Sequence, residues 1–381
     1  MVTGSPKDLR LLALAGGALV ALACGHTDPF STPPYGTTQP FDATPPVRLT
    51  LNQGADRGAS WLPDGSGIIY SSQQIARPDA DVCLAELPPT GGSQRRLVCD
   101  LSRLGVDTTN AIEWPAVSTE GRLAFVKASG AMRASGPSRE ALSVATGLDP
   151  STASDVQRIP YTVAGQPPYS AILQPRWQRE AQLVFVGAAK DVRQACSQCR
   201  VDTIVTGLRV AVLDLSSAGA APVALAGTDF ASGATPGPSS DEVYFTLGGD
   251  TRVYRRVLST GETHLVHDFG AVGIARDVHL AGGRLVAIVG GRVAFSDDPK
   301  LGPTQWDSGG VVHVLDLGSD ADVALDGPGL FRRPALAPTG DRVVAEGYPL
   351  IIQDGVDPVT GFPKKDTTVS RAGDLYLFTT P

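Results

Sequence analysis

Short runs of apolar residues alternate with turn-forming residues along the chain after residue 46, and one unit returns six times. Each unit is a short strand, a turn rich in Pro, Ser, Asp and Gly, and a second, more apolar strand. Apolar runs of this length between turn residues are typical of strands rather than helices. The six units are residues 59–70, 115–125, 175–185, 234–245, 276–287 and 334–345.

The spacing of these units fits a propeller. Aligned on their third residue, the units have the anchors Trp61, Val117, Trp177, Pro236, Val278 and Leu336. Consecutive anchors lie about 40 to 60 residues apart, which is the period of a four-stranded propeller blade. Helical repeats would show helical periodicity, and none is found. We therefore predict an all-β fold, a six-bladed β-propeller.

Further strand patterns complete the blades. We expect them at residues 81–87, 94–99, 208–215, 222–226, 252–258, 263–267, 311–317 and 322–325. The last unit continues with a strand at 374–379 but lacks a fourth, and residues 47–51 resemble the missing one. We predict that this N-terminal strand closes the last blade, because closure removes the free edges of an open sheet.

The first 46 residues differ from the rest. Lys7 and Arg10 precede an apolar run that ends Val-Ala-Leu-Ala-Cys24-Gly25. The run is shorter than the roughly 20 residues of a membrane span and fits a secretory signal. This segment resembles a bacterial lipoprotein signal, which implies a signal peptide over residues 1–23 and lipidation of Cys24. Ordinary secretion and an uncleaved anchor are the alternatives.

The same resemblance implies a location. Gly25 stands where that family carries Asp for inner-membrane retention, so we expect a lipid anchor in the outer membrane that faces the periplasm. Residues 24–46, rich in Pro and Thr, predict a flexible tether, and residues 47–381 form the predicted propeller.

Composition agrees with a turn-rich fold and narrows the partners. The 381 residues include 43 Gly and 30 Pro, with 19% charged and 6% aromatic residues. A net charge of −7 argues against a nucleic-acid partner, because such proteins carry basic surfaces. The 42% hydrophobic content is enough for a folded core. We expect a globular monomer.

One turn carries a family resemblance. Trp61-Leu-Pro-Asp-Gly-Ser-Gly67 resembles the WD-like repeat of the TolB-like propeller family, whose hallmark is a Trp-Ser-Pro-Asp-Gly turn, and residues 334–340 are a second copy. Pro presets φ, Asp binds its own backbone and Gly accepts positive φ. The resemblance covers about residues 47–381. The small domain that precedes the propeller in TolB has no counterpart, so we expect a TolB-like lipoprotein rather than TolB.

No motif for catalysis, metal or cofactor is found. The chain has no metalloprotease, serine-hydrolase, P-loop or dinucleotide motif. The clustered acids at 316–322 and 354–357 lack the twelve-residue calcium pattern. We expect no enzyme activity, no metal and no cofactor, and structural or surface roles for the histidines. These are His26, His264, His267, His279 and His313, of which His279 lies on an innermost strand and could face the central channel.

Four cysteines follow Cys24, and an even number in an exported chain predicts disulfides. Cys83 and Cys99 fall on successive predicted strands of blade one, where a bridge is reasonable. Cys196 and Cys199 lie in a long connection of blade three. A small disulfide is expected there, with a redox centre or half a zinc site as alternatives.

Three long insertions join second to third strands, at residues 127–140, 189–206 and 353–372. Loops longer than about 12 to 15 residues are usually functional or disordered. On the same face, we expect a binding surface at the channel mouth, formed by charged residues just before the innermost strands. These are Arg57, Glu113, Arg332 and Arg333, for which ordinary solvated loop charges are the alternative.

Two functions remain open. The first is a non-catalytic cell-envelope lipoprotein whose propeller face binds a protein or peptide. The alternative is binding of a small molecule or carbohydrate, or degenerate hydrolase or lyase activity, at the central channel. Converging polar and titratable side chains in the channel would favour the alternative, whereas an apolar plug beneath long ordered loops would favour the first.

Overall fold

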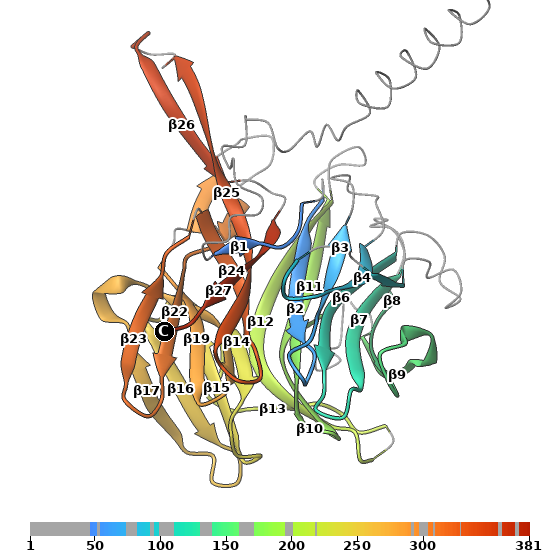
Figure 1. Ribbon diagram of the computed structural model, residues 1–381. Coiled ribbons are helices and arrows are strands. Elements are labelled where there is room, and N and C mark those ends of the chain that lie inside the picture. The colour runs from blue at the N-terminus through green and yellow to red at the C-terminus, as the bar shows by residue number, and fades with distance from the viewer. Residues whose placement is uncertain are drawn as a thin grey trace, which may run out of the picture.

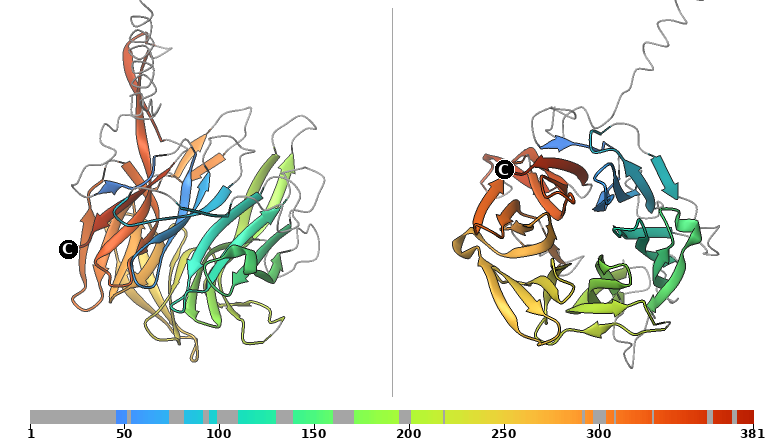
Figure 2. Two further views of the ribbon diagram at one scale, coloured as in Figure 1. Left: turned by 45° about the vertical axis from the view of Figure 1, so that its right-hand side comes forward. Right: turned by 60° about the horizontal axis from the view of Figure 1, so that its bottom comes forward.

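The computed structural model is a ring of six antiparallel sheets, the blades of a propeller, around one axis (Figure 1; Figure 2, right). The structure describes residues 46–51, 54–73, 82–91, 95–98, 110–129, 139–159, 171–194, 201–217, 219–290, 293–296, 304–307, 309–327, 329–356, 360–369 and 373–381. The predicted six-bladed, all-β fold is confirmed.

Each blade has four strands in order from the axis to the rim. Blade one contains β2 (Asp56–Trp61), β3 (Ile68–Gln73), β4 (Val82–Leu87) and β5 (Arg95–Val98). Blade two contains β6 (Asn110–Val117), β7 (Leu123–Ser129), β8 (Arg139–Ala145) and β9 (Ser154–Ile159). Blade three contains β10 (Ala171–Arg179), β11 (Gln182–Gln194), β12 (Val201–Asp214) and β13 (Val223–Ala224).

The remaining blades follow the same plan. Blade four contains β14 (Ala231–Pro236), β15 (Glu242–Leu247), β16 (Arg252–Val257) and β17 (Thr263–Asp268). Blade five contains β18 (Ala275–Ala281), β19 (Arg284–Val289), β22 (Val311–Asp316) and β23 (Ala321–Leu325), with an inserted hairpin of β20 (Val293–Ser296) and β21 (Thr304–Asp307). Blade six contains β24 (Gly329–Leu336), β25 (Arg342–Val356), β27 (Asp374–Thr379) and β1 (Val47–Arg48). Two short 3-10 helices, η2 (Pro150–Thr152) and η3 (Gly270–Val272), lie in connections.

The N-terminal strand closes the last blade, as predicted. β1 pairs antiparallel with β27, with Val47 opposite Leu377. Just beyond β1, the backbone N–H of Leu49 donates to the carbonyl oxygen of Leu375 over 2.7 Å. The outer edge of blade six is therefore formed by the first described strand of the chain, which ties the two ends of the ring together.

A buried ion pair lies at this closure. Arg48 Nη2 is 2.6 Å from Asp374 Oδ2, and both side chains are 7% exposed. Burial raises the pKa of Asp374 to about 7, although Arg48 lowers it, and the nearby Asp56 carboxylate raises it further. The closure thus contains a carboxyl group that titrates near neutrality.

Hydrophobic residues fill every interface between neighbouring blades. Six buried clusters are found, and each joins side chains of two adjacent blades, including blades six and one. Fully buried aromatic residues such as Phe125, Phe185, Phe245 and Phe331 lie in four of these interfaces. Because burial of apolar area is roughly proportional to stability, the ring is held mainly by face-to-face packing of blades.

The two tryptophan anchors join blades through equivalent contacts. Trp61 Nε1 donates to the carbonyl oxygen of Ala335 over 2.9 Å, and Trp177 Nε1 donates to that of Ala116 over 3.0 Å. An arginine of the preceding blade lies 4.8 Å over each indole ring, Arg342 over Trp61 and Arg122 over Trp177. Such contacts combine a satisfied N–H with a cation–π interaction, which explains why large aromatic residues recur at this position.

One predicted anchor is wrong. Pro236 pairs with Val243 as Trp61 pairs with Ile68, whereas the equivalent position in blade five is Leu280, which pairs with Leu285, instead of Val278. The turn that follows this strand is shorter than in the other blades, so alignment on turn residues shifts the register. In blade five, Ala281 pairs with Arg284 across a tight Gly-Gly turn whose two φ angles are positive, as in hairpin turns.

Two of the predicted long loops are paired strands. β11 and β12 remain paired out to Gln194 opposite Val201. β25 pairs with β26 (Pro363–Val369) out to Val356 opposite Pro363, and this hairpin projects from the ring (Figure 1; Figure 2, left). Pairing satisfies backbone groups that a loop would leave to water, which corrects both predictions. In the third insertion, residues 130–138 lie outside the described residues.

Several predictions fall outside the described residues. They concern the signal peptide, nearly all of the tether, and Cys24, Cys99, Cys196 and Cys199. Cys83 is buried on β4 and is disulfide-bonded, while its pairing with Cys99 stays a prediction. Within the described ranges, no helix has the length and apolar character needed to cross a bilayer.

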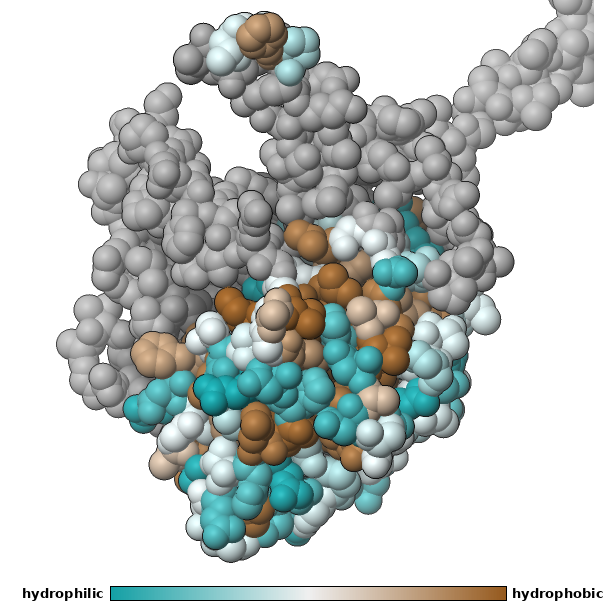
Figure 3. Space-filling model, turned by 90° about the vertical axis from the view of Figure 1, so that its left-hand side faces the viewer, coloured by the Kyte–Doolittle hydropathy of each residue, from teal (hydrophilic) through white to brown (hydrophobic). Residues whose placement is uncertain are grey.

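The outer surface shows no broad apolar face on the side seen in Figure 3, where hydrophobic and hydrophilic residues alternate. The exposed large apolar side chains come from several blades and connections. They are Val223, Phe230, Leu265, Val272, Val311, Val323 and Phe362. Scattered apolar residues of this kind are normal on a folded protein and mark no site by themselves.

Candidate functional site at the ring axis

Every innermost strand has a β-bulge near the same position of its blade. The register shifts in each of the six pairings between first and second strands, one residue earlier in blade four than in the others. Counted back from the residue pairs that follow the bulge, the equivalent residues are Gly58, Trp114, Gln174, Gly233, Asp277 and Arg333. Bulges re-aim side chains and recur next to functional sites. The ring therefore presents six re-aimed positions at one level of its axis.

Four non-glycine bulge residues adopt a left-handed backbone. Trp114, Gln174, Asp277 and Arg333 have φ of 59°, 51°, 52° and 48°. Such a conformation costs about 1 to 2 kcal/mol for an ordinary residue and persists only where the surroundings enforce it. Four copies at one level of one axis indicate that the side chains placed there have a use.

These side chains meet across the axis. Gln174 Nε2 of blade three donates to Asp277 Oδ1 of blade five over 2.6 Å. The guanidinium of Arg333 in blade six lies 4.5 Å over the ring of Trp114 in blade two. The backbone N–H of Arg333 donates to Asp277 Oδ2 over 3.2 Å. Contacts between non-adjacent blades must cross the axis, so Trp114, Gln174, Asp277 and Arg333 form what we call the axial plug.

A buried glutamate fixes one side of the plug. Glu346 lies on β25 and is fully buried. Arg333 Nη1 donates to its Oε2 over 2.9 Å and to its Oε1 over 3.2 Å. It also accepts the Gly58 N–H over 2.6 Å and the Tyr348 hydroxyl over 2.8 Å. Burial opposes the charge of Arg333, but the attraction of Glu346 outweighs it and holds the pKa of the guanidinium above its ordinary value. Burial, with Glu346, raises the pKa of Tyr348.

Two further side chains lie two residues after the bulge. They are Arg176 on β10 and His279 on β18, both half-buried. The four equivalent residues in the other blades are small: Ser60, Ala116, Thr235 and Ala335. Arg176 and His279 are thus the two large side chains at this level, and both are polar.

Arg176 has no hydrogen bond or ion pair to the described residues, and its Nε is buried without a partner. Burial lowers the pKa of Arg176 to about 10, against the raising effect of Asp277. Both Asp277 oxygens accept an N–H from another plug residue, Gln174 or Arg333. The guanidinium therefore offers unused donors in a partly desolvated place.

His279 is held as a neutral ring. Its Nδ1 accepts the backbone N–H of Leu336 in the next blade over 3.0 Å. Burial, together with the charge of Arg176, lowers the pKa of His279 well below its ordinary value. An accepting Nδ1 leaves the proton on Nε2, so the ring is a fixed N–H donor rather than a switch near neutral pH.

The structure relocates the residues predicted for the channel mouth. Arg57, Glu113 and Arg332 lie inside the innermost strands, one residue before the bulge, and Arg333 is the bulge residue itself. The expectation that they precede these strands is wrong, because each innermost strand starts earlier than its apolar run. Arg332 lies 4.6 Å over the ring of Tyr348, and Arg57 is close enough to lower the pKa of that tyrosine. Glu113 lies on β6 in blade two, and no contact among the described residues joins it to Arg332 or Tyr348.

Sequence reasoning missed most of the plug and Glu346. Glu346 has a visible signal, a lone carboxylate within the apolar run Val-Val-Ala-Glu-Gly-Tyr348. Trp114, Gln174 and Asp277 share no residue type, so only their common position after alignment of the blades would have singled them out. Two sequence predictions lead to this site: Arg333 was expected at the channel mouth, and His279 on an innermost strand that could face the channel.

The other histidines and acidic turns make local contacts. His313 Nδ1 is 3.0 Å from both carboxylate oxygens of Asp322, and His267 Nδ1 is 3.0 Å from Asp320. Asp316 accepts backbone N–H groups within its own turn. Among the described residues, no group of three or more His, Cys, Asp or Glu side chains could hold a metal ion.

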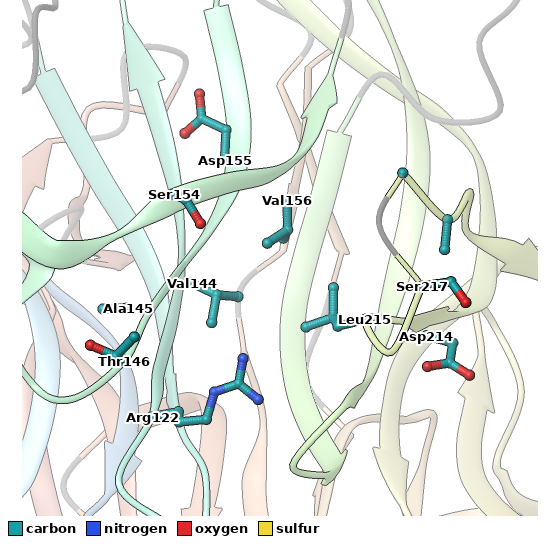
Figure 4. A pocket seen from close by; sticks show the side chains of 12 residues that line it. Arg122, Val144, Ala145, Thr146, Ser154, Asp155, Val156, Asp214, Leu215 and Ser217 are labelled. Carbon is teal, nitrogen blue, oxygen red and sulfur yellow. The ribbon is translucent and has the colours of Figure 1, made fainter.

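Away from the axis, a pocket of about 320 Å³ lies between blades two and three (Figure 4). Val144, Val156 and Leu215 line it together with Arg122. The Arg122 guanidinium is already engaged, because it stacks on Trp177 and donates to the carbonyl oxygen of Glu180. The axis, with unused donors and strained backbone, is the stronger candidate site.

Comparison with known proteins supports the fold. The structure is similar to TolB from Acinetobacter baumannii, with a TM-score of 0.51 and 14% identity over 82% of this chain and 65% of the TolB chain. It is equally similar to a gluconolactonase from Xanthomonas campestris, with a TM-score of 0.51 and 14% identity over 88% of this chain and 89% of the other. At such identity the likeness shows the propeller fold alone. No protein-family model and no curated protein matches the chain.

Proposed function

We propose that this protein binds a small polar ligand, a small molecule or carbohydrate, at the ring axis, and that it does so without catalysing a reaction. The observation that supports this most is the axial plug. Polar and titratable side chains from three blades, with the Trp114 ring from a fourth, converge there on strained backbone, which is the pattern of a binding site held in place by its scaffold. An apolar plug would have favoured a protein-binding face instead.

We further propose that the propeller acts in the cell envelope, held by a lipid on Cys24. The support is the lipoprotein-like start of the sequence followed by a Pro-rich tether. Metabolic labelling with a fatty acid should mark the protein and fail to mark a Cys24→Ser variant. Equal labelling of both would refute the anchor.

Ligand-observed NMR on the mature protein tests axial binding. The probes are neutral sugars, sugar acids and amino acid derivatives, scored by saturation transfer from protein to probe. We expect at least one probe to bind, and its signal to fall in Trp114→Leu but not in Phe230→Leu, a control whose ring is exposed on blade four. No binding by any probe, or equal binding by both variants, would overturn the proposal.

A second candidate is capture of a protein or peptide partner by the propeller face. The projecting β25–β26 hairpin favours it, because Phe362 beside its described end is 72% exposed. Affinity capture from envelope extract with the lipidated protein should yield a reproducible partner, and Phe362→Ser should lose it. The control Val323→Ser, at an exposed apolar residue on the outermost strand of blade five, should retain it. Loss of the partner in both variants or neither would count against the hairpin.

A further inference from the structure

The guanidinium of Arg176 has a buried donor without a hydrogen-bond partner among the described residues. A guanidinium carries five N–H donors in a planar fork, and a buried donor without a partner costs about 1 to 3 kcal/mol. Arg176 makes no hydrogen bond to the described residues, and its Nε has no contact with solvent. Buried polar groups are nearly always satisfied in native proteins, so such an exception calls for a missing partner.

Small residues accompany Arg176 at its level of the ring. The equivalent residues of blades one, two, four and six are Ser60, Ala116, Thr235 and Ala335. Arg176 and His279 each lie two residues after Gln174 and Asp277, whose side chains meet across the axis over 2.6 Å, so the two strands bring Arg176 and His279 to the same level on facing sides. The charge of Arg176 also lowers the pKa of His279, in agreement with this placement. His279 adds a second donor, because its Nδ1 is occupied by the Leu336 N–H and its proton resides on Nε2.

The chemistry of these groups selects the partner. Both are donors, and the nearest carboxylate, Asp277, is occupied by Gln174 and by the Arg333 N–H. The cation of the axial plug, Arg333, is already paired with Glu346. Arg176 thus carries one positive charge without a contacting carboxylate, and His279 offers a neutral N–H donor. A ligand group with one negative charge and hydrogen-bond-accepting oxygens matches this pair. Carboxylates match the arginine fork with two parallel hydrogen bonds.

We propose that Arg176 and His279 form a subsite for a single carboxylate of the ligand, with the guanidinium binding both oxygens and His279 Nε2–H donating to one of them. The inference rests on the proposed function, since it names the chemical class of the axial ligand. The carboxylate belongs either to a sugar acid or to a peptide terminus, and these two sources share the same recognition chemistry.

Two matched pairs of probes separate these sources. Sodium glucuronate is compared with glucose, and N-acetylglycine with its amide, by calorimetry on the mature protein and by the arginine Nε–H resonances of ¹⁵N-labelled protein. We expect one of the two acids to bind at least tenfold more tightly than its neutral partner and to shift one arginine resonance. That resonance should be missing in Arg176→Gln. The acid that binds more tightly identifies the source.

Variants locate the contact. Arg176→Gln should weaken acid binding at least tenfold, Arg176→Lys should restore part of it, and His279→Gln should weaken it severalfold. Arg209→Gln, which removes an exposed arginine paired with Asp229, should leave binding unchanged. Without ligand, Arg176→Gln should melt at the same temperature as the parent or higher, because it removes a desolvated charge without a partner.

The outcomes distinguish the two proposals. Equal binding of acids and neutral partners at a Trp114-dependent site, or acid binding that Arg176→Gln does not change, overturns the carboxylate subsite and leaves axial binding standing. A lower melting temperature of ligand-free Arg176→Gln contradicts the subsite as well, because it would show a structural role for the arginine. Absence of binding by every probe, charged or neutral, overturns both.

Discussion

Removing the charge of Glu346 should destabilise the ring far more than removing a surface charge. Glu346 is fully buried and accepts four contacts, two from Arg333 and one each from the Gly58 N–H and the Tyr348 hydroxyl. Glu346→Gln keeps the volume but replaces one accepting oxygen with a donating NH₂. Breaking a buried pair on one side costs about 3 to 5 kcal/mol, because a charge is left without its partner.

Chemical denaturation and thermal melting of the mature protein measure this cost. With an unfolding entropy of about 2 cal/mol/K per residue, a loss of 3 to 5 kcal/mol lowers the melting temperature by about 4 to 7 °C in a chain of this size. The matched control is Glu242→Gln, which removes a part-exposed carboxylate 3.2 Å from Arg255. That pair should contribute less than about 1 kcal/mol.

A double variant isolates the pair itself. In Glu346→Gln with Arg333→Gln, neither charge remains, so the combined loss should be smaller than the sum of the two single losses by about 1 to 3 kcal/mol. A loss for Glu346→Gln no larger than that for Glu242→Gln would refute the view that this ion pair holds the plug. Strict additivity in the double variant would refute it equally.

Three further predictions concern the closure and the cysteines. The pKa of Asp374 is about 7 in the folded protein and 3.8 in the unfolded chain. The contribution of this carboxyl group to folding stability is therefore fully present below pH 4 and is lost as pH rises through 7. Asp374→Asn should flatten that fall in urea denaturation between pH 4 and 8, and an unchanged slope would contradict the assignment. Trp61→Phe removes the hydrogen bond to Ala335 and should cost about 1 to 3 kcal/mol, read as an earlier urea midpoint; no change would contradict the role of this anchor. Peptide mapping without reduction should recover Cys83 linked to Cys99, and a free thiol at either position would rule that pairing out.

The blades could be predicted because local chemistry repeats them. The Pro-Asp-Gly turn after Trp61 forms as its residues dictate: Asp64 accepts the Ser66 N–H over 3.0 Å, and Gly65 has a φ of 71°. The fourth strand near Val47 was recognisable because blade six lacked one. Both inferences need only neighbouring residues and a count of strands.

The axial plug could not be predicted in the same way, because its contacts depend on closure of the ring. Gln174 and Asp277 are 103 positions apart, and Arg333 meets Trp114 from a non-adjacent blade. A bulge adds one residue to one strand, and the six bulges here share no residue type, so no sequence motif marks their common position. Arg333 was singled out by its charge, but its partner Glu346 lies on a strand that otherwise reads as core.

The projecting hairpins were misjudged because length was taken as a sign of loops. The segment 349–356 contains Ile351, Ile352 and Val356, which favour strands, but also Pro349, Asp354 and Gly355, which do not. Its continuous pairing with β26 extends the blade instead of interrupting it, so insertion length was a poor guide there.

The most direct test of axial binding is a crystal structure of the mature protein soaked with the tightest-binding probe. We expect density at the axis in contact with Arg176 and beside the plug, with Gln174 and Asp277 still joined. Density confined to the pocket between blades two and three or to the β25–β26 hairpin, with only water beside Arg176, would contradict it.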